Sequence, residues 1–262
     1  MAEDAERHLL RATFDDAAHQ YDDARPVAPP EVFDDLVELA RLEPGARVLE
    51  IGCGTGKATR PLAERGFSIL GVELGANLAE VARRKVADFP HVEIVTSSFE
   101  EWDPGREHFD AVVSFNAFHW LDPDVRFAKC SSVLKAGGSL AVFGSRFFAH
   151  DDADPVWLAL QDDHDAVLGD VKPFSHLEDR QDRSADFTRN GHFVTVTRKT
   201  YLWNLTYSAE GYVQLLATMS TYRTLPDDVR EELFARIEQR IRADGGSVKP
   251  TRGDVLYVAT TA

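Results

Sequence analysis

The stretch VLEIGCGTGKAT, Val48 to Thr59, places three glycines within five residues directly after an apolar run. Glycine weakens helices and strands, so its use on alternate residues indicates a tight turn that something must require. The apolar run predicts a strand over Ala46 to Ile51, and the residues after the loop predict a helix from Lys57 to Arg65, closed by Gly66. A strand, a glycine loop and a helix in this order begin a parallel α/β sheet.

The alternation of strand-like and helix-like patterns continues through residues 45–145. Short βα units of this kind connect through right-handed crossovers. Further elements are predicted as strands at Phe67–Val72, Val92–Val95, Phe109–Phe115 and Ser139–Gly144, and as helices at Ala76–Val86 and Asp122–Leu134. Beyond the core, helices are predicted around residues 32–40, 154–167, 208–222 and 226–243, and strands at Val194–Thr206 and Val255–Thr260.

Composition narrows the classes of function. The chain has 262 residues and a formal net charge of -15, which argues against a nucleic-acid partner and an anionic membrane surface because both call for clustered Lys and Arg. Its two cysteines, Cys53 and Cys130, form neither a disulfide framework nor a metal-ligand spacing. The acidic start MAEDAERHLL lacks the features of a secretory signal. We therefore expect a cytoplasmic protein that works on small molecules.

The glycine loop allows three interpretations. A Walker phosphate loop fails, because Ile51 stands where its first glycine belongs and Ala58 follows Lys57. A dinucleotide fingerprint fits poorly, because Gly52, Gly54 and Gly56 place the third glycine one residue early. The third interpretation is a nucleoside without a pyrophosphate, approached closely by the glycine backbone.

Two acidic residues favour the third interpretation. Glu50 ends the first strand, where it would repel a pyrophosphate and attract a cation. Glu73 ends the second strand, where it is placed to accept hydrogen bonds from both ribose hydroxyls. This pair suits a cationic nucleoside such as S-adenosylmethionine.

VLEIGCGTG, Glu73 and FDAVVSFNAFHWLDP followed by LKAGGSLAVF resemble a class I S-adenosylmethionine-dependent methyltransferase. The resemblance covers residues 45–145 closely. It implies a Rossmann-like, doubly wound sheet of seven strands, mostly parallel with an antiparallel last strand. It further implies one domain over residues 1–262: an N-terminal lid and helix (1–44), a cofactor-binding core (45–145), an insert or lid (146–192), and C-terminal strands and helices that complete the sheet (193–262).

The resemblance also implies roles for individual residues. Gly52, Gly54 and Gly56 would line the methionine part of the cofactor, and Glu50 would anchor this loop. Glu73 would bind the ribose. Further contacts would come from Leu74 beside the adenine, from Asn116 and Ala117 facing the methionine and its methyl group, and from Tyr21 and Arg25 closing over the cofactor. Lys57 is expected to be solvated and Cys53 to be a small buried filler.

The adenine contact departs from the family pattern. Where the family often has an Asp, this chain has Ser98, followed by Phe99. Either Ser98 makes a neutral contact with the adenine amino group or Glu100 substitutes for the Asp.

The segment NAFHWLDP, Asn116 to Pro123, is the predicted wall of the active site, because it leaves the carboxyl end of a strand. His119 is a candidate general base or a packing residue. Phe118 and Trp120 are candidates to face a planar acceptor or the sulfonium. Arg146 is a further candidate for the acceptor site, with Trp203 and Tyr222 as candidate lid residues.

These observations predict methyl transfer from S-adenosylmethionine to a small, partly apolar acceptor by in-line displacement. Two alternatives remain open: an NAD(P)-dependent oxidoreductase, which would also use Glu73, and a non-catalytic scaffold of the same fold. The sequence does not identify the acceptor or the oligomeric state, and it leaves protein substrates open.

Overall fold

Strands with apolar residues on both sides build the centre of the molecule. In β1 (Arg47–Ile51), Val48 and Leu49 are both fully buried, on opposite faces of the sheet. A strand that is buried on both faces must be covered by helices on both. The computed structural model describes residues 15, 18–150, 152–169, 175–176 and 181–262.

Within those residues, seven strands pair in the order β3-β2-β1-β4-β5-β10-β7, and the short β6 pairs with the far end of β5. β10 runs antiparallel to both of its neighbours, and the strands from β3 to β5 are parallel. This confirms the predicted mostly parallel sheet with an antiparallel last strand. The remaining strands are β2 (Ser68–Glu73), β3 (Val92–Thr96), β4 (Phe109–Phe115), β5 (Leu134–Ala149), β6 (Ser175–His176), β7 (Thr195–Asn204) and β10 (Thr251–Thr260).

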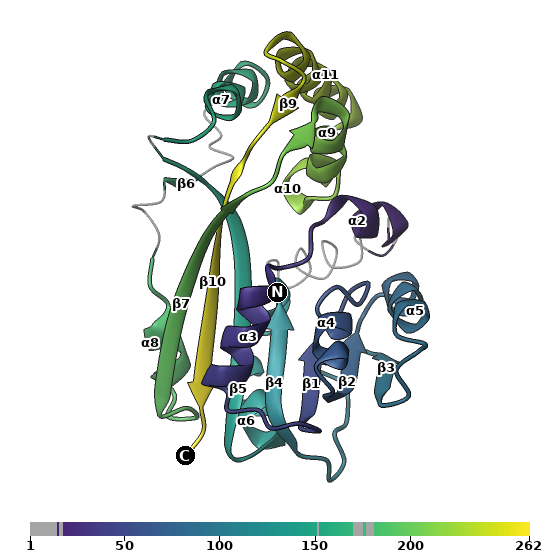
Figure 1. Ribbon diagram of the computed structural model, residues 1–262, viewed down its shortest axis with the longest axis vertical. Helices are drawn as coiled ribbons and strands as arrows, with labels where there is room; N and C mark the ends of the chain where they lie inside the picture. The colour runs from purple at the N-terminus through teal and green to yellow at the C-terminus, as the bar shows by residue number, and fades with distance from the viewer. Residues whose placement is uncertain (1–14, 16–17, 151, 170–174, 177–180) are drawn as a thin grey trace.

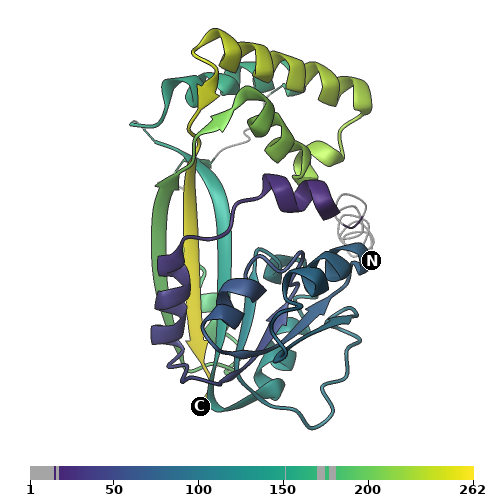
Figure 2. The same cartoon turned by 45° about the vertical axis from the view of Figure 1, so that its right-hand side comes forward.

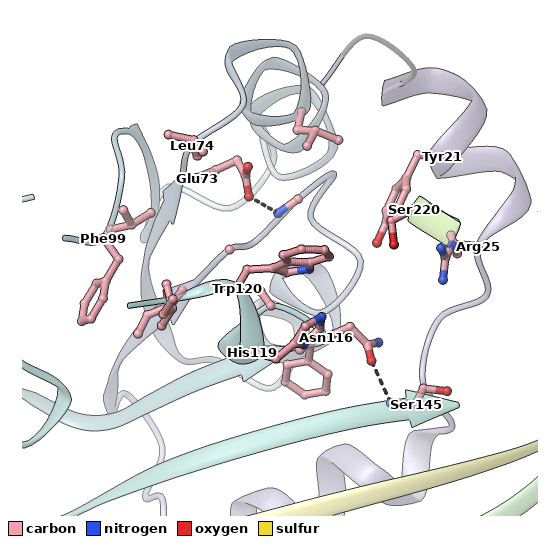
Figure 3. Close-up of a pocket in the computed structure, with 18 of the residues that line it drawn as sticks. Tyr21, Arg25, Glu73, Leu74, Phe99, Asn116, His119, Trp120, Ser145 and Ser220 are labelled. Carbon is pink, nitrogen blue, oxygen red and sulfur yellow. Dashed lines mark hydrogen bonds between the residues drawn. The ribbon is translucent and has the colours of Figure 1, made fainter. Parts of the chain in front are cut away.

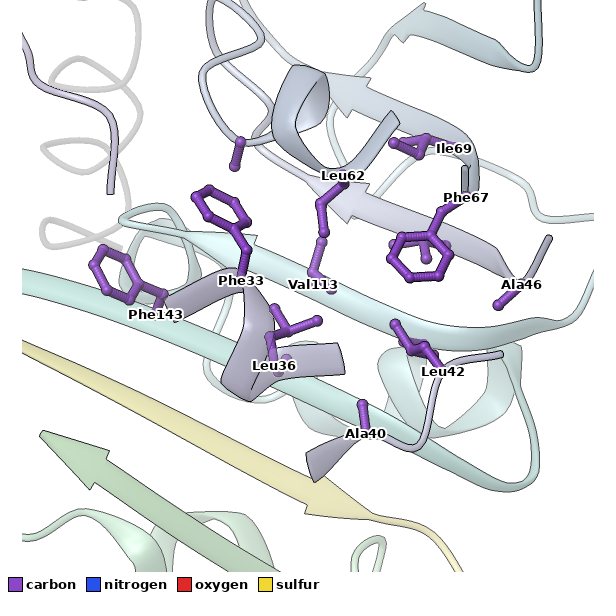
Figure 4. Close-up of a cluster of buried hydrophobic side chains, with 14 of the residues drawn as sticks. Phe33, Leu36, Ala40, Leu42, Ala46, Leu62, Phe67, Ile69, Val113 and Phe143 are labelled. Atoms are coloured by element: carbon purple, nitrogen blue, oxygen red, sulfur yellow. The ribbon is translucent and has the colours of Figure 1, made fainter. Parts of the chain in front are cut away.

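Helices cover the two faces of the sheet (Figures 1 and 2). One face carries α3 (Pro30–Leu39), α4 (Thr59–Glu64) and α5 (Ala76–Lys85), and the other carries α6 (Arg126–Val133) and α8 (Ser184–Thr188). Figure 4 shows the apolar cluster beneath α3 and α4, where side chains of these helices meet those of the strands.

A second group of helices lies beyond the carboxyl ends of the parallel strands (Figure 1). Its apolar cluster joins a helix of the predicted insert to helices of the C-terminal tail. The elements of this helical layer are α7 (Pro155–Leu168), α9 (Ala209–Ala217), α10 (Ser220–Arg223), α11 (Asp227–Ala243), and the two-stranded ribbon of β8 (Tyr207–Ser208) and β9 (Ser247–Val248). The N-terminal α2 (Ala18–Ala24) contacts both α9 and α5, so it lies between this layer and the sheet.

The fifth strand is longer than predicted. The prediction began it at Ser139 and ended it at Gly144, but β5 runs over sixteen residues. Its start is irregular, because the register jumps from the Phe109–Leu134 pair to the Ala111–Ser139 pair. Its end continues past β4 because β10 pairs with it as far as Phe147. Within the described ranges, no helix has the length and apolar character that a membrane crossing requires.

Candidate active site

The glycine loop turns sharply out of β1. Gly52, Gly54 and Gly56 have φ values of +67°, +56° and +79°, which side chains other than glycine adopt only at a cost. The Gly52 amide donates to the Val72 carbonyl at 2.8 Å, so the loop is held against β2. A Cβ at Gly52 would lie 2.4 Å from the Cβ of Ala117. Glycine is therefore required at position 52 for two reasons: the backbone is left-handed, and the loop lies in close contact with the segment after β4.

Glu73 ends β2 and is buried. One of its carboxylate oxygens accepts from the Gly54 amide at 2.8 Å (Figure 3). The other accepts from the Gly75 amide at 2.9 Å. Glu73 therefore holds the glycine loop at the end of β2, and it lines the cavity in which the ribose is predicted to bind.

Glu50 lies fully buried beside the same loop. Burial raises the pKa of Glu50 to about 8, and the negative charge of Glu73 raises it further. The nearby Thr59 hydroxyl acts in the opposite direction, although it forms no hydrogen bond with Glu50. Among the described residues, none hydrogen-bonds the Oε2 atom of Glu50. A buried carboxyl oxygen without a partner is costly, and it suits a ligand that brings a positive charge or a hydrogen-bond donor.

Glu73 and the glycine loop line a cavity of about 390 Å³. Of the residues predicted to bind the cofactor, it brings together Tyr21, Arg25, Gly52, Gly54, Glu73, Leu74, Phe99, Asn116 and Ala117. Glu50 and Gly56 do not line it: Glu50 lines a smaller cavity next to it, and Gly56 lies against Ala82 of α5. The predicted acceptor residues Trp120 and Arg146 and the candidate base His119 also line this cavity.

Ser98 does not line the cavity. Its hydroxyl accepts from the Glu101 amide at 3.2 Å, and the alternative Glu100 accepts from the Asp122 amide at 3.1 Å. Ser97 stands at the cavity wall instead. The sequence correctly indicated that the turn after β3 reaches the cavity. It did not indicate which side chain of that turn lines the cavity, because this depends on how the turn packs.

Asn116 occupies a special backbone position directly after β4. Its φ is +56°, a value that Asn tolerates better than most residues. Its side-chain oxygen accepts from the Ser145 amide at 2.8 Å (Figure 3). This hydrogen bond ties the end of β4 to β5 at the floor of the cavity.

A buried polar network lies behind Ser145. The Ser145 hydroxyl donates to Asp254, and the Arg252 guanidinium donates to Ser145. Trp203 donates its indole N–H to Asp254 at 2.5 Å. Trp203, a predicted lid residue, is thus part of this network, and Tyr222 is buried in the helical layer next to His164. Neither lines the cavity, which receives Met219, Ser220 and Thr221 from the same region.

The N-terminal helix closes one side of the cavity (Figure 3). Arg25 donates to the Thr218 hydroxyl at 2.8 Å and to its carbonyl at 3.2 Å, and it stacks over Tyr21. This arrangement joins α2 to the end of α9. Tyr21 and Arg25 both face the cavity, and their contact with a cofactor carboxylate stays a prediction.

Lys57 is not solvated, contrary to expectation. Its ammonium donates to the Asp22 carbonyl at 2.6 Å and pairs with the Asp22 carboxylate at 3.4 Å. Asp22 also accepts from Thr55 at 2.7 Å and pairs with Lys85. The lysine after the glycine loop therefore anchors α2. No sequence signal near Asp22 could reveal this, because the partners are far apart along the chain. Cys53 is buried, as predicted.

A second cavity, also about 390 Å³, adjoins the first. The two share Asn116, His119, Ser145 and Arg146. Phe118, predicted near the acceptor, is buried in the wall of this second cavity. Desolvation lowers the pKa of His119 to about 4, helped by the positive charges of Arg146, Arg126 and Arg183. His119 is therefore neutral at pH 7.

A doubly wound sheet, a glycine loop without phosphate-binding spacing and acids at two neighbouring strand ends define a nucleoside-binding protein of the Rossmann-like class. Residues 48–138 match the sequence model of a family of methyltransferase domains. An uncharacterized methyltransferase of Bacillus mycoides is 32% identical over 205 residues, which cover 72% of this chain and 93% of that protein. One of Mycobacterium tuberculosis is 29% identical over 235 residues, covering 89% of this chain and 87% of that protein.

Solved structures share the fold. The S-adenosylmethionine-dependent methyltransferase from Thiobacillus denitrificans, in complex with S-adenosylhomocysteine, has a TM-score of 0.51 at 18% identity over 95% of this chain and 97% of its own. The chain belongs to the class I S-adenosylmethionine-dependent methyltransferases. Its cofactor is S-adenosylmethionine, which decides against the nicotinamide alternative.

Proposed function

We propose that this methyltransferase modifies a small-molecule acceptor that binds in the second cavity. The observation that carries the proposal is the shared wall of the two cavities: Asn116, predicted to face the transferred methyl group, and His119 line both. A volume of about 390 Å³ lies within the usual range for small-molecule sites. The acidic net charge of -15 favours a metabolite over a nucleic acid.

The chain's own residues bind and align the reactants. Bound S-adenosylmethionine supplies an electrophilic methyl group on a sulfonium. Glu73 would hold the ribose, and the backbone at Gly52 and Gly54 would allow close approach of the methionine end. Glu50 would accept a hydrogen bond through its buried Oε2 atom, which has no partner among the described residues. Alignment can contribute about 7–11 kcal/mol to such a displacement, so rigid placement is the main task of this site.

His119 supplies a neutral imidazole beside the acceptor cavity. Because its pKa of about 4 lies well below neutral pH, it can accept a hydrogen bond or a proton over the whole physiological range. Its low basicity makes proton abstraction weak. Orientation of the acceptor through this hydrogen bond is therefore the larger part of its role, and Trp120, whose ring lies 4.9 Å from it, supports that position.

The test is a search for the acceptor with a binding control. Purified protein is first titrated with S-adenosylhomocysteine and, separately, with NADH in a calorimeter. It is then incubated with S-adenosylmethionine and a panel of small metabolites, and methylated products are sought by mass spectrometry. We expect the protein to bind S-adenosylhomocysteine but not NADH, and to methylate at least one metabolite of the panel. Binding without transfer to any member would support the scaffold alternative, and transfer only to proteins would overturn the small-molecule assignment.

A further inference from the structure

The second cavity has an aromatic wall. Phe118 and Phe127 meet edge to face at 5.2 Å between ring centres, and Phe187 joins them at 6.3 Å and 5.4 Å. Tyr257 of β10 stacks on Phe187 at 5.2 Å. The rings come from the segment after β4, from α6, from α8 and from β10, so four separate parts of the chain build one apolar surface. Such a surface binds planar or apolar groups.

The same cavity concentrates positive charge. Of the residues that the structure describes, three arginines line it, Arg126, Arg146 and Arg183, and one carboxylate, Asp186, which pairs with Arg189 at 2.9 Å. All three arginines act electrostatically on His119, so they surround one space. Among the described side chains, none forms a hydrogen bond or ion pair with the guanidinium groups of Arg146 and Arg183.

This local charge runs against that of the whole chain, which carries 44 acidic residues and 29 Lys and Arg. An anion is repelled by the net charge and attracted only where cations gather. Arginine is well suited to hold a carboxylate through two parallel hydrogen bonds. The cavity thus offers a specific place for an acidic group on an otherwise acidic protein.

The floor of the cavity is open because of one glycine. Val142, Gly144 and Arg146 alternate on the same face of β5, and all three line the cavity. A Cβ at Gly144 would meet only the side chain of Val255, at 3.9 Å. Packing would therefore allow a side chain at position 144. Because this residue is a glycine, the space next to Arg146 stays open.

We propose that the methyl acceptor is a carboxylic acid with an apolar, planar body. Its acid group binds among Arg146, Arg183 and Arg126, and its body lies along the wall of Phe118, Phe127, Phe187 and Tyr257. The proposal rests on the assignment of the second cavity to the acceptor. It adds the chemical class of that acceptor and names Arg183 and Gly144 as residues that determine specificity.

Binding measurements test the charge requirement without turnover. Benzoate, phenylacetate and indole-3-acetate are titrated into the protein, with and without S-adenosylhomocysteine, and compared with the matching neutral amides. We expect at least one acid to bind at least about tenfold more tightly than its amide, and Arg183→Gln to weaken that acid about tenfold, the loss expected for one charged hydrogen bond. Arg236→Gln, on the exposed side of α11, removes the same charge elsewhere and should leave acid binding unchanged.

A second pair of variants tests the location. Gly144→Val places a side chain in the cavity and should abolish acid binding, whereas Gly144→Ala should reduce it only slightly. Acids and amides that bind alike, or acid binding that survives both Arg183→Gln and Gly144→Val, would overturn the proposal. Failure to bind S-adenosylhomocysteine would instead count against the cofactor site, so the two assignments fail in different measurements.

Discussion

The two cavities of the active site differ in charge and in construction. The cofactor cavity is lined by the carboxylate of Glu73, and the buried carboxyl of Glu50 lies beside it at the end of the adjacent strand. The second cavity is built around three arginines and a group of aromatic rings. A cationic nucleoside and an anionic acceptor would each meet the opposite charge, and the two would attract one another across the shared wall.

They also differ in how the chain assembles them. The two acids belong to consecutive βα units, so local geometry alone brings them together. The arginine cavity takes residues from α6, β5, α8 and β10, which are distant in sequence. The cofactor half is thus the part that a shared fold preserves, and the acceptor half is free to vary with the substrate.

The largest expected effect comes from the ribose acid. Glu73→Gln keeps the shape of the side chain but removes the charge that would accept two hydroxyl groups. We expect the affinity for S-adenosylhomocysteine to fall about 100-fold, or about 2.7 kcal/mol, as measured by calorimetry. The matched control is Glu107→Gln, which removes an exposed carboxylate paired with Arg47 at 3.2 Å and should change nothing.

The same variant tests whether the two halves are separate. Binding of the aromatic acids should be unchanged in Glu73→Gln if the acceptor cavity forms independently of the ribose site. If folded Glu73→Gln bound neither S-adenosylhomocysteine nor the aromatic acids, the two cavities would not be independent. If its affinity for S-adenosylhomocysteine were unchanged, Glu73 would not bind the ribose.

Glu50 gives the cofactor half a pH dependence. Its pKa is raised from 4.5 to about 8 by burial, so between these values the folded state binds a proton that the unfolded state does not. The free energy of unfolding should therefore fall as pH rises through this window, by about 1.4 kcal/mol per pH unit from this group. Chemical denaturation at pH 5.5, 6.5 and 7.5 measures the slope, and Glu50→Gln should lack this contribution. Equal slopes in both proteins would contradict the burial of an ionisable carboxyl at this position.

The parts predicted from sequence are those with a local cause. The bounds of β4, Phe109–Phe115, match the prediction, because an apolar run between turn residues is itself the signal. Gly52, Gly54, Glu73 and Asn116 could be placed at one edge for the same reason, since the carboxyl ends of parallel strands meet there.

The parts that were missed depend on distant partners. The extension of β5 beyond Gly144 exists because β10 pairs with it, and Lys57 is held because α2 folds over the glycine loop. Arg183 and Tyr257 carry no motif, and only the packed structure puts them in one cavity. Sequence patterns report which residues form strands; they do not report which loops meet above them.

The smallest predicted effect concerns the contact between the two halves. Gly52→Ala and Gly54→Ala both force a side chain into a left-handed backbone, at φ +67° and +56°, which costs about 1–2 kcal/mol in each. Only Gly52→Ala also places a Cβ at 2.4 Å from Ala117, whereas nothing lies within 4 Å of the one at Gly54. We expect Gly52→Ala to lower the free energy of unfolding by about 1 kcal/mol more than Gly54→Ala in urea denaturation. Adding Ala117→Gly to Gly52→Ala should remove that difference, because it deletes the Cβ atom with which the new side chain collides. If the two single variants are equally destabilised, the glycine loop does not pack against the segment that leads into the arginine cavity.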